Sequence, residues 1–288
     1  MSEAVLYIVA TPIGNIDDIT YRAVKVLREV DLIAAEDTRR AGQLLSRIDI
    51  KGKELVSYYD QVEQERSKKI IERMVRHEIS VALISDAGTP CVSDPGFRLV
   101  AAAHAANIRV SPLPGACAMT ALVSASGLPT DRFTFVGFLP QKDKALRTEL
   151  SLWESLASPI VFYESTRRFK KTLNIIRQCH PDARICVGRE LTKLYEEITQ
   201  MDLNAALDWA DEHTHLKGEL VAMIDNLGRH ESLDQEEHVG ELEALLLNDF
   251  KAGKRFKEIL RERKDCGLAR GDLYQLLMKV KSKYREKG

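Results

Sequence analysis

The sequence predicts an α/β protein made of two lobes and a small helical domain. Three observations support this prediction. Short β-branched runs alternate with helical patterns over the first hundred residues, a second series of strands and helices follows residues 112–129, and amphipathic helical patterns end the chain. A chain of 288 residues is long enough for more than one domain. We expect the divisions 1–114, 115–228 and 229–288.

The first lobe is expected to contain a mainly parallel sheet. Its five strand candidates lie at residues 5–10, 31–35, 54–58, 81–85 and 108–113. Apolar residues at helical spacing occupy the intervals between them, at residues 21–30, 38–46, 64–76 and 95–106. Strands that alternate with helices form parallel sheets, and such sheets bind ligands at the carboxyl ends of their strands.

One of these strand ends leads into an unusual loop, "SDAGTPCVSDPG", at residues 85–96. Glycine permits positive φ angles and proline fixes φ, so a connection rich in both holds a specific non-repetitive shape. We expect Asp94 to cap the following helix and Pro95 to be its first residue, which would leave free helix N–H groups near the loop. A tight turn and a bound ligand would each explain the loop.

The second lobe is expected to combine several strands with three helices. The strand patterns lie at residues 133–138, 159–164, 183–190, 195–199 and 218–224, and the helical patterns near 143–155, 167–178 and 202–212. The polar stretch 228–241 is expected to be a linker to three short helices. The end of the chain resembles a helix-turn-helix, whose second helix has four apolar residues on one face, Leu273, Leu276, Leu277 and Val280.

The charge distribution, the apolar runs and the cysteines indicate where the protein works and which of its segments are basic. The formal net charge is −1, but residues 251–288 contain 13 Lys and Arg against 5 Asp and Glu, so a basic end follows an acidic body. The chain has no apolar run long enough to span a bilayer, and its start lacks signal-peptide features, so we expect a soluble cytoplasmic protein. The cysteines are odd in number and scattered, which suits reduced thiols: Cys91, Cys117, Cys179, Cys186 and Cys266.

The first loop, "VATPIGNIDDIT" at residues 9–20, follows a strand where a dinucleotide site would place its glycines. It has one glycine instead of three, and two aspartates there would repel a pyrophosphate. No phosphate-binding P-loop is present either, so NAD and ATP chemistry is disfavoured. Asp17, Asp18 and Thr20 would simply cap the next helix, an interpretation that is compatible with Pro12 and Ile13 also contacting a ligand.

Two further strand ends carry charged residues. Asp86 suits a ligand with hydroxyl or ammonium groups, and an Asx-turn or a cap is an equal alternative. The segment "AAEDTRRAGQLL" combines carboxylates with guanidinium groups on Glu36, Asp37, Arg39 and Arg40. Such a cluster could bind a phosphodiester and activate a hydroxyl group. An exposed helix start, with Asp37 or Thr38 as its cap, is the simpler interpretation.

The segment "VFYESTRRF" at residues 161–169 also ends a strand. A core position for Phe162 or Tyr163, and an ordinary helix surface for Arg167 and Arg168, are the alternatives to a binding role. The seven histidines form no H-E-x-x-H motif and no zinc-ligand spacing with cysteine, so no metal is expected. A G-x-S-x-G motif is also absent.

Eight segments, taken together and in order, resemble a known family. They read "VATPIGNIDDIT", "AAEDTRR", "SDAGTPCVSDPG", "PLPGACAMTALVSASGLP", "GFLP", "FYESTRR", "GRELTKLYEE" and "KGELV". They are similar to the tetrapyrrole methylase-like class (class III) of S-adenosylmethionine-dependent methyltransferases, and within it to the branch that 2′-O-methylates a cytidine of 16S ribosomal RNA. The resemblance covers essentially the whole chain. It implies a parallel-sheet N-terminal lobe, a mixed-sheet second lobe, a small helical C-terminal domain and a homodimer.

The resemblance also implies the ligands and their site. S-adenosylmethionine would lie in the cleft between the lobes, held largely by backbone groups of the loop "SDAGTP". The residues implied for cofactor binding are Pro12, Asp86, Gly88, Thr89, Ala116, Ala118, Phe162, Leu191 and Gly218. The family's substrate is a cytidine in the decoding region of 16S rRNA in the 30S subunit. The residues expected to contact this RNA are Arg39, Arg40, Arg167, Arg168, Lys254 and Arg255.

The expected chemistry is methyl transfer to a ribose hydroxyl. We expect Glu36 or Asp37 to act as general base and Arg39 to orient the adjacent phosphodiester. The basic C-terminal domain would dock on RNA through phosphates, or would simply be a solvated helical bundle.

Two other classes of function remain compatible with the sequence. One is methylation of a small tetrapyrrole by the same fold and cofactor, against which the basic end and the "EDTRR" cluster argue. The other is a non-enzymatic helix-turn-helix regulator, which would not need the Gly- and Pro-rich loops at strand ends.

Overall fold

The computed structural model describes residues 4–153, 155, 156, 158–213, 218–225, 242–263 and 270–285. The chain divides into two compact units, Met1–Asn226 and Leu227–Gly288, which are described separately. The boundaries expected at residues 114 and 228 stay predictions.

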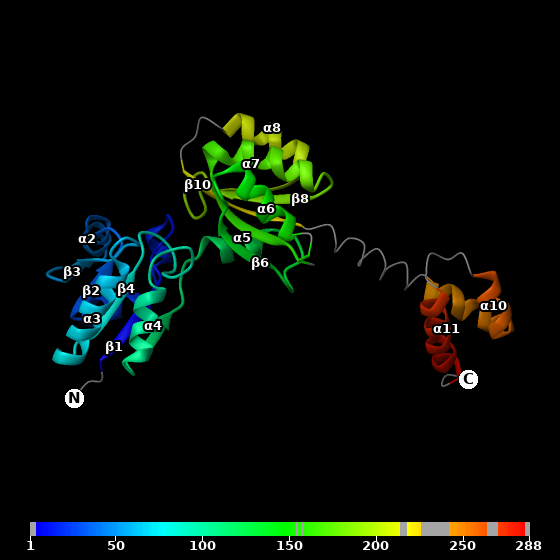
Figure 1. Cartoon of the computed structure of the whole chain (residues 1–288), viewed down its shortest axis with the longest axis horizontal. Coiled ribbons are helices and arrows are strands. Elements are labelled where there is room, and N and C mark those ends of the chain that lie inside the picture. The colour runs from blue at the N-terminus through cyan, green and yellow to red at the C-terminus, as the bar shows by residue number, and fades with distance from the viewer. Residues whose placement is uncertain are drawn as a thin grey trace. The chain divides into compact units, whose positions relative to one another are not determined.

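The first sheet of the larger unit has five parallel strands in the order β3-β2-β4-β1-β5 (Figure 1). The strands are β1 (Val5–Val9), β2 (Leu32–Ala35), β3 (Glu54–Ser57), β4 (Val81–Ile84) and β5 (Arg109–Leu113). Helices α1 (Tyr21–Glu29), α2 (Thr38–Arg47), α3 (Glu63–His77) and α4 (Phe97–Ala105) connect them, and a 3-10 turn, η1 (Ile16–Asp18), precedes α1. The parallel sheet predicted for the first lobe is confirmed.

Helices cover both faces of this sheet. Leu27 of α1 packs with Ile33 on one face, and Met74 of α3 and Leu99 of α4 pack with Leu83 on the other. Residues on both sides of the central strands are therefore buried, which explains why these strands read as nearly continuous apolar runs.

The second sheet is mixed, with the order β6-β7-β10-β8-β9. Its strands are β6 (Thr134–Phe138), β7 (Ile160–Ser165), β8 (Arg184–Arg189), β9 (Glu197–Asp202) and β10 (Glu219–Ile224). Strands β6 and β7 pair in parallel, and the other neighbours are antiparallel. Helices α6 (Asp143–Trp153), α7 (Thr166–Cys179) and α8 (Leu203–His213) cover one face, and α5 (Ala118–Ala125) packs on the other. The mixed second sheet is thus also confirmed.

Several helix starts agree with the capping interpretation of the sequence. Thr20 caps α1 by accepting a hydrogen bond from Ala23 N at 3.0 Å. Asp37 caps α2 by accepting one from Arg39 N at 2.8 Å. Asp17 lies inside η1, which Asn15 caps instead.

The expected start of α4 is wrong. The N-cap residue is Gly96, whose φ is +145°, and no side chain of its own segment caps the helix. The carboxylate of Glu63, at the start of α3, accepts hydrogen bonds from Gly96 N (2.9 Å) and Arg98 N (3.3 Å) instead. The cap comes from a distant segment, so Asp94 is left for another role.

The smaller unit has its own apolar core. A helix at 242–251, α10 (Phe256–Glu262) and α11 (Arg270–Arg285) contribute to it. The buried residues include the four predicted to share one helix face, Leu273, Leu276, Leu277 and Val280. The expected linker 228–241 and the expected turn lie outside the described residues. Among the helices that the structure describes, none is both long and apolar enough to cross a membrane.

Candidate functional site

A cavity of about 550 Å³ lies where loops from the first sheet meet the second sheet. From the first sheet it is lined by Ile13, Arg40, Ala87, Gly88, Thr89, Val92, Ser93 and Asp94. From the second sheet and α5 it is lined mainly by Cys117, Ala118, Phe138, Tyr163, Glu190, Leu191, Lys193, Gly218 and Glu219. The cavity therefore opens at the carboxyl ends of parallel strands, where α/β proteins bind their ligands.

Backbone contacts hold the wall formed by residues 85–96. Thr11 N donates to Gly88 O at 2.8 Å, and Gly88 N donates to Thr11 O at 3.0 Å, which joins the loops after β1 and β4. Gly88 has a φ of +87°, a conformation that favours glycine. Thr89 Oγ1 donates to Ala116 O at 3.0 Å and ties the loop to the segment before α5. The loop is thus fixed between two other strand ends.

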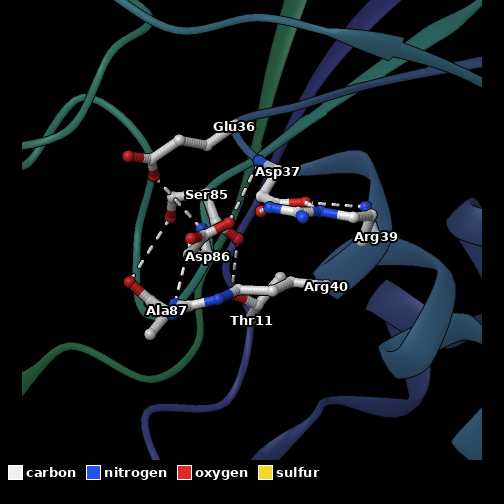
Figure 2. A network of polar contacts seen from close by, with 8 residues as sticks. All are labelled: Thr11, Glu36, Asp37, Arg39, Arg40, Ser85, Asp86 and Ala87. Carbon is white, nitrogen blue, oxygen red and sulfur yellow. Dashed lines mark hydrogen bonds and ion pairs between the residues drawn. The ribbon is translucent and has the colours of Figure 1, made fainter.

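Asp86 joins this loop to the start of α2 (Figure 2). Its Oδ1 accepts a hydrogen bond from Asp37 N at 3.1 Å, its Oδ2 forms an ion pair with Arg40 Nη1 at 3.0 Å, and its N–H donates to Glu36 Oε2 at 3.4 Å. Asp86 is not among the residues that line the cavity. Protein groups occupy its carboxylate, so its structural role is to hold the "EDTRR" segment beside the cavity.

The two acids expected to act as bases have opposite electrostatic settings. Arg39 binds both carboxylate oxygens of Asp37, at 3.2 and 2.7 Å, and these hydrogen bonds hold the pKa of Asp37 far below its usual range. Partial burial raises the pKa of Glu36, although the hydrogen bond from Asp86 N opposes this shift. Asp37 is therefore a poor proton acceptor, and Glu36 is the better of the two.

Asp94 is a cavity residue that sequence reasoning assigned only to a cap. Burial raises its pKa to about 6, a hydrogen bond from Ser85 acts in the opposite direction, and the carboxylates of Glu36, Asp86 and Glu219 raise it further. It lines the cavity from the loop before α4. An aspartate just before a helix reads the same in the sequence whether it caps that helix or lines a cavity. Only the three-dimensional position of Asp94 shows that it lines the cavity.

The residues expected to bind the cofactor separate into two groups. Those that line the cavity are Gly88, Thr89, Ala118, Leu191 and Gly218. Those that do not are Pro12, Asp86, Ala116 and Phe162. Phe162 is fully buried against Trp153 in the core, so its core interpretation is confirmed. The next residue on the same strand, Tyr163, points to the opposite face and lines the cavity instead.

The two residues of α7 that were expected to contact RNA, Arg167 and Arg168, differ in their surroundings. Arg168 forms an ion pair with the fully buried Glu164 at 3.2 Å and donates to Leu139 O and Pro140 O at 3.3 and 3.0 Å. These contacts give Arg168 a structural role. Arg167 is exposed.

In the smaller unit, Lys254 forms ion pairs with Asp249 at 3.0 Å and Glu262 at 2.7 Å, which fix it within the helical unit. Arg255 is exposed and is the N-cap residue of α10, where its N–H donates to Glu258 Oε2 at 2.9 Å. Within the described ranges, no group of three or more His, Cys, Asp or Glu could hold a metal ion.

Comparison with known proteins identifies the family. The family model described as Tetrapyrrole (Corrin/Porphyrin) Methylases matches residues 5–207. A protein of Halalkalibacterium halodurans named "Ribosomal RNA small subunit methyltransferase I" is 39% identical over 279 residues, which cover 94% of this chain and 93% of the relative. A protein of the same name from Haemophilus influenzae is 44% identical over 233 residues, with coverage of 80% and 82%.

Solved structures support the fold. The methyltransferase CobJ superposes with a TM-score of 0.59 at 22% identity, covering 78% of this chain and 95% of CobJ. Diphthine synthase gives the same TM-score at 14% identity, covering 81% and 95%. With a family model that spans most of the larger unit and relatives that match along most of their length, the chain belongs to the tetrapyrrole methylase family, in the group named ribosomal RNA small subunit methyltransferase I.

Proposed function

We propose that this protein uses S-adenosylmethionine to 2′-O-methylate a cytidine ribose in the decoding region of 16S rRNA, acting on the small ribosomal subunit as a homodimer. The observation that supports the proposal most directly is the position of the "EDTRR" segment. The ion pair between Asp86 and Arg40 ties this segment to the loop after β4, and Arg40 is part of the cavity lining. The proposed cofactor site and the proposed phosphodiester-binding arginine would then lie side by side.

The cavity suits S-adenosylmethionine in size and chemistry. Its volume of about 550 Å³ lies within the range of small-molecule sites. Gly88, Thr89 and Gly218 offer backbone groups, Ile13 and Leu191 offer apolar surface, and Glu219 offers negative charge for a ligand that carries ammonium and sulfonium groups. When bound, this cofactor supplies a methyl group that its positive sulfur makes electrophilic. The protein must then place a ribose oxygen in line with that methyl carbon.

The arginines are proposed to place the ribose. The Arg39 side chain is 87% exposed and is held by Asp37, so its guanidinium is pre-oriented at the surface. Arg40 is held by Asp86. Guanidinium groups bind phosphates by paired hydrogen bonds, and we propose that Arg39 and Arg40 bind the phosphodiester beside the target ribose. Positioning of this kind can lower a barrier by about 7 to 11 kcal/mol in favourable cases.

The exposed Arg167 and Arg255 remain in the proposed RNA surface. Arg168 and Lys254 form ion pairs within the protein. We propose that they contribute to RNA binding only indirectly, by stabilising the segments in which they lie. Arg255 lies in the basic smaller unit, which we propose supplies affinity for ribosomal RNA through phosphate contacts.

The decisive test is methyl transfer by the purified full-length protein. Labelled S-adenosylmethionine is offered with hypomethylated 30S subunits, with naked 16S rRNA, or with a porphyrin or corrin acceptor, and any modified nucleotide is mapped by mass spectrometry. We expect a 2′-O-methyl group on one cytidine of the 30S subunit. The variant Arg40→Met should lose most of this transfer while it still binds S-adenosylmethionine in calorimetry.

A charge-matched control is Arg73→Met, which removes a surface ion pair with Glu54 on β3. It should transfer methyl groups at the rate of the unsubstituted protein. Transfer to the tetrapyrrole alone would contradict the RNA substrate and would keep the fold and cofactor. Cofactor binding without transfer to any acceptor would contradict the proposed reaction.

A further inference from the structure

We propose that Asp94 is the catalytic base that accepts the proton of the attacking ribose hydroxyl, an inference that rests on the proposed function. Glu36 and Asp37, the acids expected from the sequence, would then hold the site together without taking the proton. Three structural observations lead to Asp94: its place in the cavity, the rigidity of its support and its lack of a competing cation.

Asp94 lies where the two halves of the reaction would meet. It lines the cavity together with Tyr163 and Glu219 of the second sheet. The charges of Glu36 and Asp86 also act on Asp94. Asp94 therefore lies close to the polar contacts by which Asp86 holds Arg40. A methyl donor in the cavity and a ribose positioned by Arg40 would both be within reach of this carboxylate, whereas Glu36 and Asp37 are not among the cavity-lining residues.

The segment that carries Asp94 is held firmly. Two residues later, Gly96 packs so closely that an added Cβ would lie 2.5 Å from Cys91 Sγ and 2.8 Å from Leu83 Cδ2. The buried Glu63 binds Gly96 N and Arg98 N and forms an ion pair with the Arg98 guanidinium at 3.3 Å. A base must be positioned within hydrogen-bond distance of its proton, and rigid support of this kind lowers the cost of that placement.

The other cavity carboxylates are less suited to the role. Glu190 is paired with Lys193 at 2.9 Å, so a cation already occupies its carboxylate. Glu219 is exposed at the start of β10. Among the described residues, no ion pair to Asp94 is found, so its carboxylate remains available to a hydroxyl group.

The proposed step balances in atoms and electrons. The ribose oxygen forms a bond to the methyl carbon while the bond between that carbon and sulfur breaks. The electron pair of the broken bond stays on sulfur, which becomes a neutral thioether. The hydroxyl proton passes to Asp94, which is left as a neutral carboxylic acid and releases the proton to water after the product departs.

The charged surroundings of Asp94 set the pH at which it can act. Some of the titratable and charged groups around Asp94 line the cavity with it: Arg40, Cys117, Tyr163, Glu190, Lys193 and Glu219. Others lie outside the lining and act on Asp94 or on its loop through their charges: Glu36, Glu63, Asp86 and Cys91. Burial and the neighbouring carboxylates raise the pKa of Asp94 to about 6. A base with this pKa is ionised at neutral pH and still binds a proton well.

The test compares Asp94→Asn with Glu36→Gln in the full-length protein. Single-turnover methylation of 30S subunits is measured between about pH 5.5 and 8.5, and affinities for S-adenosylmethionine and for 30S subunits are measured separately. We expect Asp94→Asn to lower the rate by about 10² to 10⁴-fold and to remove the inflection near pH 6. Both affinities should change by less than about threefold. Asp182→Asn, an exposed aspartate in the turn before β8, is the charge-matched control.

Each outcome decides the assignment. A slow Asp94→Asn variant with unchanged affinities and a flattened pH profile supports it, and Asp94→Glu should then retain part of the rate. An equal loss in rate and in S-adenosylmethionine affinity would make Asp94 a cofactor contact and overturn the role as base. A normal rate in Asp94→Asn with a slow Glu36→Gln would return the role to Glu36. No transfer by the unsubstituted protein, despite cofactor binding, would overturn the proposed function and this inference together.

Discussion

The Glu63 carboxylate lies 2.9 Å from the backbone nitrogen of Gly96 and caps α4 from the start of α3. Glu63 is only 4% exposed, and it also accepts a hydrogen bond from Tyr58 Oη at 3.2 Å. One buried side chain therefore connects a helix that lies outside the cavity to the loop that lines it. The shape of the cavity wall depends on this long-range contact.

Glu63→Ala should weaken both the fold and the cavity. It leaves the N–H of Gly96 and the N–H of Arg98 without their acceptor, which costs about 1 to 3 kcal/mol of unfolding free energy. Because residues 92–94 line the cavity, S-adenosylmethionine affinity should fall as well. Urea denaturation and calorimetry measure the two effects. Glu65→Ala on the exposed side of the same helix is the control, and equal stability of the two variants would contradict the capping role.

Alanine in place of Gly96 should destabilise the protein, whereas alanine in place of Gly42 should stabilise it. At Gly96 the φ of +145° and the contacts with Cys91 and Leu83 make alanine both strained and crowded, so Gly96→Ala should lower the unfolding free energy by about 1 to 3 kcal/mol. Gly42, within α2, has no atom within 4 Å of the added Cβ, so Gly42→Ala should raise it by about 0.5 to 1 kcal/mol. Thermal unfolding of the two variants checks the difference in sign.

Much of the fold could be predicted because its signals are local. The runs that form β2 and β4 are apolar because both faces of the sheet are covered, and Thr20 and Asp37 mark helix starts by bonding to their own segments. Helix α5 was not predicted as an element. Its sequence, AMTALVSA, is small and apolar on most sides, so it shows little helical periodicity.

The site could be predicted only in part because its contacts join distant segments. The loop 85–96 is recognisable from its glycines and prolines, but the roles of single residues depend on partners far along the chain. Arg168 binds carbonyl groups of Leu139 and Pro140, and the carboxylate that caps α4 lies more than thirty residues before it. Because the Glu63 carboxylate caps α4, Asp94 does not have the capping role that the sequence predicted, and no local sequence pattern indicates this.

The stability of the protein should reveal the raised pKa of Asp94 without any assay of activity. Its pKa is about 6 in the folded protein, above the ordinary aspartate value of 3.8, so the folded state binds the proton more tightly. Stability contributed by this group is complete below about pH 4 and is lost as pH rises to about 6. Asp94→Asn should therefore raise the unfolding free energy by about 1 to 2 kcal/mol at about pH 7.5, because water screens part of the charge of this partly exposed carboxylate, and by little at about pH 4. A gain that does not depend on pH would contradict the raised pKa.

The exposed basic residues of α10 should bind ribosomal RNA. Lys257 and Arg261 are both exposed and lie four residues apart, so they share one face of the helix, whereas Lys254 is occupied by Asp249 and Glu262. Each phosphate contact releases counterions, which makes binding weaken as salt rises. The double variant Lys257→Glu/Arg261→Glu should therefore bind 30S subunits more weakly and should reduce the slope of log affinity against log salt by about 1.5.

The matched control is Arg47→Glu/Lys51→Glu, which reverses the exposed charge of the last residue of α2 and a second exposed charge in the segment after the helix. Filter binding at several salt concentrations measures both variants, and calorimetry with S-adenosylmethionine shows whether the cavity is intact. Since α10 belongs to the unit 227–288 and the cavity to the unit 1–226, cofactor affinity should be unchanged in both variants. Equal loss of 30S affinity in the two double variants would mean that the protein binds RNA through its overall charge, and a normal affinity for 30S in both would leave α10 with a structural role only.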